Sequence, residues 1–222
     1  MIKSYVVRTG HMSTHQRQGY NQYLPQYQLL QAGEYWDYAS IFGRVADTIV
    51  EIGFGMGATL ATMALENPHI NYIGIEVHPP GIGALSCLLH EQQIHNVRIA
   101  NFDAKHVFTA NIQPESLSGV NIFFPDPWPK RKHYKRRLIQ ADFLKLLVRA
   151  LQPAGVIHCA TDWEAYAAQM LTVLQAHSEL VNIADNGAYH ERPLSRPVTK
   201  FESRGKNLGH GVWDLLFKKK ST

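Results

Sequence analysis

The chain has 222 residues, 45% of them hydrophobic, and a formal net charge of +4 at neutral pH. This length suits one α/β domain, the apolar fraction argues against a disordered chain, and the mildly basic balance is compatible with an acidic partner. The two cysteines, Cys87 and Cys159, form no CxxC pair, which disfavours a disulfide framework and a cysteine-based zinc site. The chain shows no signal segment and no apolar run of about 18 residues, so we expect a cytoplasmic protein.

Along the chain, a polar and aromatic segment precedes an alternation of strands and helices. Residues 1–44 predict an N-terminal arm or cap, and residues 45–222 predict one globular domain. The expected strands are 48–52, 72–75, 97–102, 120–124, 156–160, 180–184 and 212–217, and the expected helices are 58–66, 84–93, 138–151 and 162–176. We expect Pro153 to Gly155 to close the third helix and a capping box, Thr161 to Glu164, to open the last. The pattern predicts a doubly wound, mostly parallel sheet of seven strands.

Three glycines, Gly53, Gly55 and Gly57, follow the first expected strand and precede a helix. Glycine allows a tight turn and lets a ligand approach the backbone closely. The same run also fits the looser dinucleotide-binding pattern, so the glycines alone do not choose the ligand. A sharp turn without a ligand is the less favoured alternative in this strand–turn–helix context.

Acidic residues mark the ends of the first three strands: Glu51, Glu76 and Asp103. The carboxyl ends of parallel strands meet at one edge of a sheet, where ligands bind in open α/β folds. An acidic edge would repel the pyrophosphate of a dinucleotide, whereas it would attract the sulfonium and ammonium groups of S-adenosylmethionine. The acids therefore favour S-adenosylmethionine as the cofactor, although Asp103 could equally well cap a helix.

A proline-rich segment, residues 123–130, follows the fourth strand and contains Asp126 and Trp128. Prolines restrict the backbone, so we expect a stiff loop at the end of this strand. A stiff loop beside a cofactor suits a site that must orient two reactants. The alternative is a rigid turn in solvent.

A basic run follows at once, because six of the eight residues from Lys130 to Arg137 are Lys or Arg. Such a run is usually a solvated face. This one adjoins the proline-rich segment and contains His133 and Tyr134, so it indicates phosphate contacts and stacking on unpaired bases. A nucleic-acid substrate is favoured, and the candidate contacts are Lys130, Arg131, Lys132, Lys135 and Arg136.

Taken together, these blocks closely resemble the bacterial tRNA (guanine-N7)-methyltransferase family. The most specific matches are residues 123–137 and 196–202, and further matches lie at 50–56, 74–78, 160–163 and 208–215. The resemblance covers nearly the whole chain. It implies a class I methyltransferase fold of the Rossmann-like type and methyl transfer from S-adenosylmethionine to N7 of a guanine in tRNA, at position 46 of the variable loop.

The resemblance also implies roles for individual residues. The family's cofactor residues fall on Glu51, Glu76, Asp103 and Asp126, and its RNA-contacting residues fall on Lys130, Asp162, Thr199, Lys200, Phe201 and Glu202. We expect Asp126 to be the catalytic residue, through stabilising the charge that develops on the guanine, binding the guanine edge, or binding the donor amine. Without the resemblance, Asp162 could be only part of a helix cap and residues 199–202 only a structured loop.

We expect no metal ion, because His11 and His15, four residues apart in an irregular arm, lack further ligands. Both a monomer and a homodimer remain open. Three other functions also remain open: a methyltransferase acting on an exocyclic amine of a nucleic acid, a dehydrogenase, and a noncatalytic tRNA-binding module. Pro125 to Trp128 loosely resembles the Asp-Pro-Pro-Tyr motif of the first class, whereas the acidic strand ends disfavour the other two.

Overall fold

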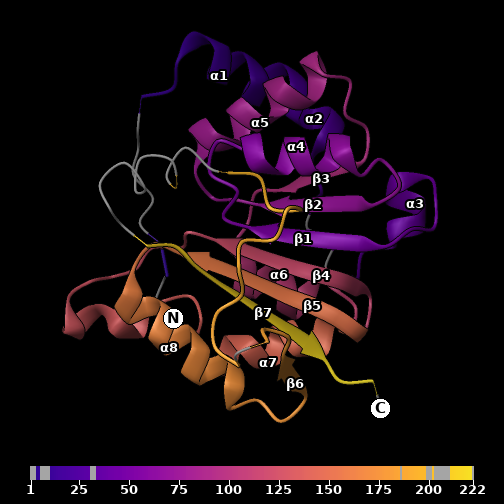
Figure 1. Ribbon diagram of the computed structural model, residues 1–222. Helices are drawn as coiled ribbons and strands as arrows, with labels where there is room; N and C mark the ends of the chain where they lie inside the picture. Colours follow the sequence, from indigo (N-terminus) through magenta and orange to yellow (C-terminus); the bar gives the residue numbers. More distant parts are fainter. Residues whose placement is uncertain are drawn as a thin grey trace.

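The computed structural model describes residues 4–5, 11–30, 34–185, 187–198, 202 and 211–221, which form one seven-stranded sheet between two layers of helices (Figure 1). The strand order is β3-β2-β1-β4-β5-β7-β6. Strands β1 to β5 run parallel, and β7 runs antiparallel to both β5 and β6, so the expected mostly parallel sheet is confirmed. The strands are β1 (Thr48–Ile52), β2 (Asn71–Ile75), β3 (Val97–Ala100), β4 (Leu117–Phe123), β5 (Leu151–Thr161), β6 (Leu180–Asn182) and β7 (Trp213–Lys219).

The two helical layers explain why the central strands are apolar on both sides. Helices α4 (Ala58–Glu66) and α5 (Pro79–Glu91) cover one face, and α6 (Ala104–Ala110), α7 (Ala141–Ala150) and α8 (Glu164–Gln175) cover the other (Figure 1). Strands of a parallel sheet that are buried on both faces have nearly continuous hydrophobic sequences. In β1, Val50 packs into the cluster on the α6–α8 face, whereas Ile49 contacts the cluster on the α4–α5 face.

The boundaries of three helices, α5, α7 and α8, differ from the prediction. Helix α5 begins at Pro79, because proline fits the first turn, where no backbone donor is needed. Helix α7 ends at Ala150, and Pro153 to Gly155 belong to β5, so the expectation that they close a helix is wrong. Leu151 instead pairs with Leu117, ahead of an irregularity in the register between the two strands.

The start of α8 also differs, because no side-chain hydrogen bond caps it. Trp163 occupies the N-cap position, and the Thr161 hydroxyl accepts a hydrogen bond from the Trp163 N–H at 3.2 Å. The expected capping box is therefore wrong. Tyr166 and Met170 are buried, whereas Trp163 is exposed.

The described part of the N-terminal segment is helical where the sequence predicts an irregular arm. It contains α1 (Thr14–Gln18), the π-helical turn η1 (Gly19–Tyr23), α2 (Leu24–Tyr27) and α3 (Tyr38–Phe42). Both α1 and η1 pack against α5 (Figure 1). Leu24 and Tyr27 are buried in the same hydrophobic cluster as α4 and α5, so packing against the domain stabilises these short helices. Among the described segments, none of the helices combines the length and hydropathy of a membrane span.

Two glycines allow α1 and η1 to approach α5 closely. A Cβ atom added to Gly19 would lie 2.0 Å from the Gly83 carbonyl oxygen, and one added to Gly83 would lie 2.0 Å from the Gln16 carbonyl oxygen. A methyl group at either position would therefore overlap a backbone carbonyl oxygen.

Replacing Gly83 with alanine tests this packing. In an ordinary helix the change would stabilise the chain by about 1 kcal/mol. Here we expect Gly83→Ala to lower the free energy of unfolding by about 1–3 kcal/mol, as overpacking does, measured by urea denaturation. As a control, Gly43→Ala adds a Cβ that meets no atom within 4 Å, at a backbone φ of 67°, and should cost only about 1–2 kcal/mol for its left-handed backbone. A Gly83→Ala protein more stable than the wild type would contradict the close approach.

Candidate active site

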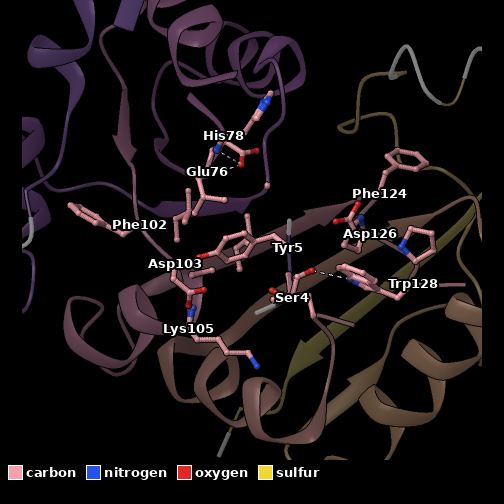
Figure 2. A pocket seen from close by; sticks show the side chains of 18 of the residues that line it. Ser4, Tyr5, Glu76, His78, Phe102, Asp103, Lys105, Phe124, Asp126 and Trp128 are labelled. Carbon is pink, nitrogen blue, oxygen red and sulfur yellow. Dashed lines mark hydrogen bonds between the residues drawn. The ribbon is translucent and has the colours of Figure 1, made fainter. Parts of the chain in front are cut away.

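A cavity of about 750 Å³ lies at the carboxyl ends of the parallel strands (Figure 2). Segments that follow β1, β2, β3 and β4 line it, and so do two residues near the N-terminus. Its acidic lining residues are Glu76, Asp103 and Asp126, and its apolar ones include Ile52 and Phe102. The position is the one where ligands bind in open α/β sheets.

The three glycines form the turn between β1 and α4, and all of them have left-handed backbones. Their φ angles are 77° at Gly53, 58° at Gly55 and 80° at Gly57, a region that residues with a Cβ atom rarely adopt. Gly53 lines the cavity, whereas Gly57 is the N-cap of α4 and packs against Leu85. The turn therefore needs glycine for its geometry as well as for access to a ligand.

The carboxylate of Glu76 is held at the end of β2 by three backbone donors. One oxygen accepts from the N–H groups of Val77 (2.7 Å) and His78 (3.0 Å), and the other accepts from the N–H of Gly55 (3.0 Å). This arrangement connects the glycine turn to the next strand and directs a fixed acceptor into the cavity (Figure 2). Such an acceptor can bind the hydroxyl groups of a ribose.

Asp103 combines the two roles that the sequence leaves open. Its carboxylate caps α6, accepting from the N–H groups of Lys105 (2.9 Å) and His106 (3.2 Å). It also lines the cavity, where it forms a hydrogen bond with the Tyr5 hydroxyl. Burial and then the charge of Asp103 raise the pKa of Tyr5, so the phenol remains a donor to the carboxylate.

Glu51 does not line the cavity; it is buried in the middle of the sheet. Its register partners are Gly74 on β2 and Asn121 on β4, and its Oε2 atom has no hydrogen-bond partner within the described part of the chain. Burial, followed by the nearby charge of Glu76, raises the pKa of the Glu51 carboxyl group to about 8. Near neutral pH this carboxyl group is therefore mostly protonated, and a positively charged ligand nearby would favour its ionised form.

The raised pKa of Glu51 makes the stability of the protein depend on pH. Between pH 5 and 8 the folded protein retains a proton that the unfolded chain releases, so stability falls as pH rises, by at most about 1.4 kcal/mol per pH unit. Glu51→Gln removes this group, so its stability relative to the wild type should increase from pH 5 to 8 and level off above. Urea denaturation at several pH values would measure this, and parallel curves for the two proteins would contradict it.

The proline-rich loop has two residues in a strained backbone conformation on either side of Asp126. Phe124 and Trp128 have φ angles of 50° and 45°, although neither is glycine. The Phe124 N–H donates to the Ala160 carbonyl at 2.8 Å, and the Trp128 indole N–H donates to the Ser4 carbonyl at 2.9 Å (Figure 2). These bonds compensate for the strain and hold Asp126 at the cavity wall.

Arg137, the last residue of the basic run, is buried inside the protein. Its guanidinium group donates to the Pro127 carbonyl at 2.8 Å and to the Gln169 side chain at 2.5 Å. It also stacks 3.7 Å from the centre of the Tyr134 ring. Arg137 therefore supports the proline-rich loop from within.

The other predicted cations lie in or next to the 3₁₀ helix η2 (Arg131–Arg136). Lys130, Arg131, Lys132 and Lys135 are exposed. Arg136 is half-buried, because its guanidinium group stacks 3.8 Å from the centre of the Trp128 ring and donates to the Tyr5 carbonyl at 3.5 Å. The run is thus divided into exposed cations and two arginines that pack against the loop.

The remaining residues predicted to contact RNA are Asp162 and residues 199–202. Of these, Thr199, Lys200 and Phe201 lie outside the described residues. Glu202 is described and buried, and its carboxylate accepts from Arg196 at 2.7 Å. Arg196 also forms a two-bond ion pair with Asp214, at 2.7 and 2.8 Å. Asp162 is half-buried and directly follows β5. RNA contacts by Asp162 and Glu202 stay predictions, and Glu202 has in addition an internal role as a partner of Arg196.

Sequence reasoning missed Ser4 and Tyr5 in the cavity wall. The hydrogen bond between Trp128 and Ser4 joins residues 124 positions apart, so no local pattern indicates it. Arg196 and Asp214 were also missed as a pair, because they come from different segments 18 residues apart.

Known proteins with similar sequences are methyltransferases. Residues 46–215 match a family described as "Putative methyltransferase". The chain is 56% identical over 221 residues to the tRNA (guanine-N(7)-)-methyltransferase of Legionella pneumophila (strain Corby), covering 99% of this chain and 98% of that one. It is 52% identical to the protein of that name from Paraburkholderia xenovorans (strain LB400), covering 99% and 84%.

The chain belongs to the tRNA (guanine-N7)-methyltransferase family. Solved structures agree with this family's fold at low sequence identity. The 16S rRNA methyltransferase KamB superposes with a TM-score of 0.55 at 12% identity, covering 85% of this chain and 95% of that one. An rRNA methylase from Streptococcus thermophilus gives a TM-score of 0.53 at 13% identity, covering 79% and 88%. The expected class I methyltransferase fold is confirmed, and the family membership excludes the dehydrogenase alternative.

Proposed function

We propose that this protein transfers a methyl group from S-adenosylmethionine to N7 of a guanine in tRNA. One juxtaposition supports this most: an acidic cavity lies at the strand ends, beside a loop that continues into an exposed basic run. A small-molecule methyltransferase would not need the basic run. The chain's relatives named tRNA (guanine-N(7)-)-methyltransferase provide independent support.

The residues of the cavity fit S-adenosylmethionine. Glu76 is fixed as an acceptor for ribose hydroxyls, and Asp103 and Asp126 add negative charge for an ammonium and a sulfonium group. Glu51, buried and unpaired at Oε2, gives the turn a further acidic group beneath it. When bound, S-adenosylmethionine supplies an electrophilic methyl group on its sulfonium.

Guanine N7 has a lone pair in the plane of the ring, so the reaction needs no general base. The main tasks of the protein are alignment of the reactants, which can contribute about 7–11 kcal/mol in ideal cases, and stabilisation of the positive charge that forms on the guanine. Asp126 has the charge and the place for the second task, because the strained and hydrogen-bonded loop holds it at the cavity wall. Binding of the guanine edge or of the donor amine by Asp126 would use the same position.

The exposed cations Lys130, Arg131, Lys132 and Lys135 would bind phosphates of the tRNA. The target base must leave its stacking partners to reach the cavity, so we expect base flipping. A guanine at position 46 of the variable loop stays a prediction. We also propose a cytoplasmic location, because the proposed substrate is a cytoplasmic RNA.

Nucleoside analysis of bulk tRNA, after incubation with the purified protein and isotopically labelled S-adenosylmethionine, tests the function. We expect labelled 7-methylguanosine. Label only on an exocyclic amine would support the alternative methyltransferase activity, and no label in any nucleoside would support a noncatalytic tRNA-binding module.

Replacing Asp126 with asparagine should slow methyl transfer on the order of a hundredfold, since the change removes a charge at a site of developing positive charge. The side chain is nearly isosteric, so the loop should keep its conformation. Single-turnover methylation with donor and tRNA both saturating would measure the rate. Asp142→Asn, at an exposed position on α7, is the matched control and should react as the wild type does. An Asp126→Asn rate within about twofold of the wild type would exclude a role for this charge in the chemical step.

Replacing Lys132 and Lys135 together with alanine should weaken tRNA binding and leave the binding of S-adenosylhomocysteine unchanged. For each lysine that binds a phosphate, its removal should reduce the slope of log affinity against log salt by about 0.7–0.9. The double variant of Lys145 and Lys218, two exposed lysines outside the run, removes the same charge and is the control. Equal slopes for the two double variants would mean that the run acts only through net charge.

A further inference from the structure

Three side chains with metal-binding atoms meet between α1 and α5, away from the residues that line the cavity. They are His15 on α1 and Cys87 and Glu91 on α5, and their ligand atoms all lie within 4.8 Å of one another. His15 Nε2 lies 2.7 Å from Glu91 Oε1, and the Cys87 thiol donates to the His15 carbonyl at 3.2 Å. Cys87 and Glu91 are one helical turn apart, so they share a face of α5.

The chemistry of this group is that of a zinc ligand set. Zn²⁺ binds thiolate sulfur at about 2.3 Å, imidazole nitrogen at about 2.0–2.1 Å and carboxylate oxygen at about 2.0–2.2 Å, in a tetrahedral arrangement. Those lengths place the ligand atoms of one ion about 3.3–3.6 Å apart. The observed ligand atoms all lie within 4.8 Å of one another, with His15 Nε2 and Glu91 Oε1 at 2.7 Å, so binding an ion would require adjustments of the side-chain torsions.

The backbone around these side chains is arranged for their close approach. A Cβ atom added to Gly19 would lie 2.7 Å from the Cys87 sulfur as well as 2.0 Å from the Gly83 carbonyl oxygen. Only glycine at position 19 therefore lets the chain that follows α1 lie against Cys87. The His15 carbonyl, one turn earlier, accepts the hydrogen bond from the Cys87 thiol. The packing of the helices thus brings the three side chains together.

Two of the three side chains are open to solvent, which gives an ion access to the group. The Cys87 side chain is fully buried, whereas 57% of the His15 side chain and 52% of the Glu91 side chain are exposed. Burial and the neighbouring charge of Glu91 raise the pKa of the Cys87 thiol, so the thiolate is unfavourable here without a cation. A bound divalent cation would stabilise the thiolate. The exposed side leaves a coordination position for water.

We propose that His15, Cys87 and Glu91 bind one Zn²⁺ ion, with water as the fourth ligand, and that the ion fastens α1 to α5. Binding releases the proton of the Cys87 thiol to solvent and uses the lone pair of His15 Nε2. The site is independent of the proposed methyl transfer, and its role is structural. The sequence shows no further ligands near His15. The other two, Cys87 and Glu91, lie 72 and 76 positions further along the chain, so no local pattern indicates the site.

Cobalt substitution tests the proposal directly. Untagged protein, treated with chelator and desalted, is titrated with Co²⁺ and then with Zn²⁺. We expect one equivalent of Co²⁺ to produce the visible bands of tetrahedral cobalt and a near-ultraviolet band from thiolate ligation, and Zn²⁺ to abolish both. We also expect Zn²⁺ to raise the Tm of the wild-type protein by several degrees, because it binds the folded state.

Matched variants assign the bands to the three side chains. Cys87→Ser should lose the thiolate band, and His15→Ala should weaken Co²⁺ binding by at least about tenfold while it folds normally, since His15 is largely exposed. His11→Ala, in the same N-terminal segment, and Cys159→Ala, on β5, should behave as the wild type does. Absence of a thiolate band in the wild type, or an equal Zn²⁺ effect on the Tm of wild type and His15→Ala, would overturn the proposal. Neither readout depends on methylation, so failure here is separate from failure of the proposed function.

Discussion

Three carboxylates gather at one edge of the sheet, close to the buried carboxyl group of Glu51, and the candidate site depends on how the chain keeps them together against their mutual repulsion. Backbone donors hold the carboxylates of Glu76 and Asp103, a strained loop positions Asp126, and Glu51 is buried with a pKa of about 8. An edge of this kind binds cations more readily than anions. The donor and the methylated base of the proposed reaction are both cationic, so the same negative potential serves ligand binding and the chemical step.

The central part of the fold could be predicted because its signals are local. Strands β1 and β2 have short apolar sequences that end at Ile52 and Ile75, and both agree closely with the prediction. The glycine turn and the proline-rich loop are equally local. The short helices α1, η1 and α2 were missed, because they are stabilised by packing against α5, and only the folded chain provides that partner. The helix α6 was missed too, although its capping residue Asp103 was identified.

Charged residues in the candidate site divide into those whose role follows from the sequence and those whose role depends on distant partners. Lys132 and Lys135 are exposed, as a charge run predicts. Arg137 belongs to the same run, yet it is buried beneath Pro127, because the 3₁₀ turn directs it inward. Arg196 is paired with Asp214, and His15 with Glu91. The partners are too far apart in the sequence for a local pattern to indicate either pair.

The contact between Gly19 and Gly83 limits how the chain can vary. At each position the space of the missing side chain is filled by a backbone carbonyl oxygen of the opposite segment. A clash between two side chains can be relieved by making the second one smaller, but a carbonyl oxygen is present whatever residue supplies it. No second substitution nearby can therefore compensate for a larger residue at position 19 or 83. The two glycines form a single constraint, and any redesign of the N-terminal helices has to keep both.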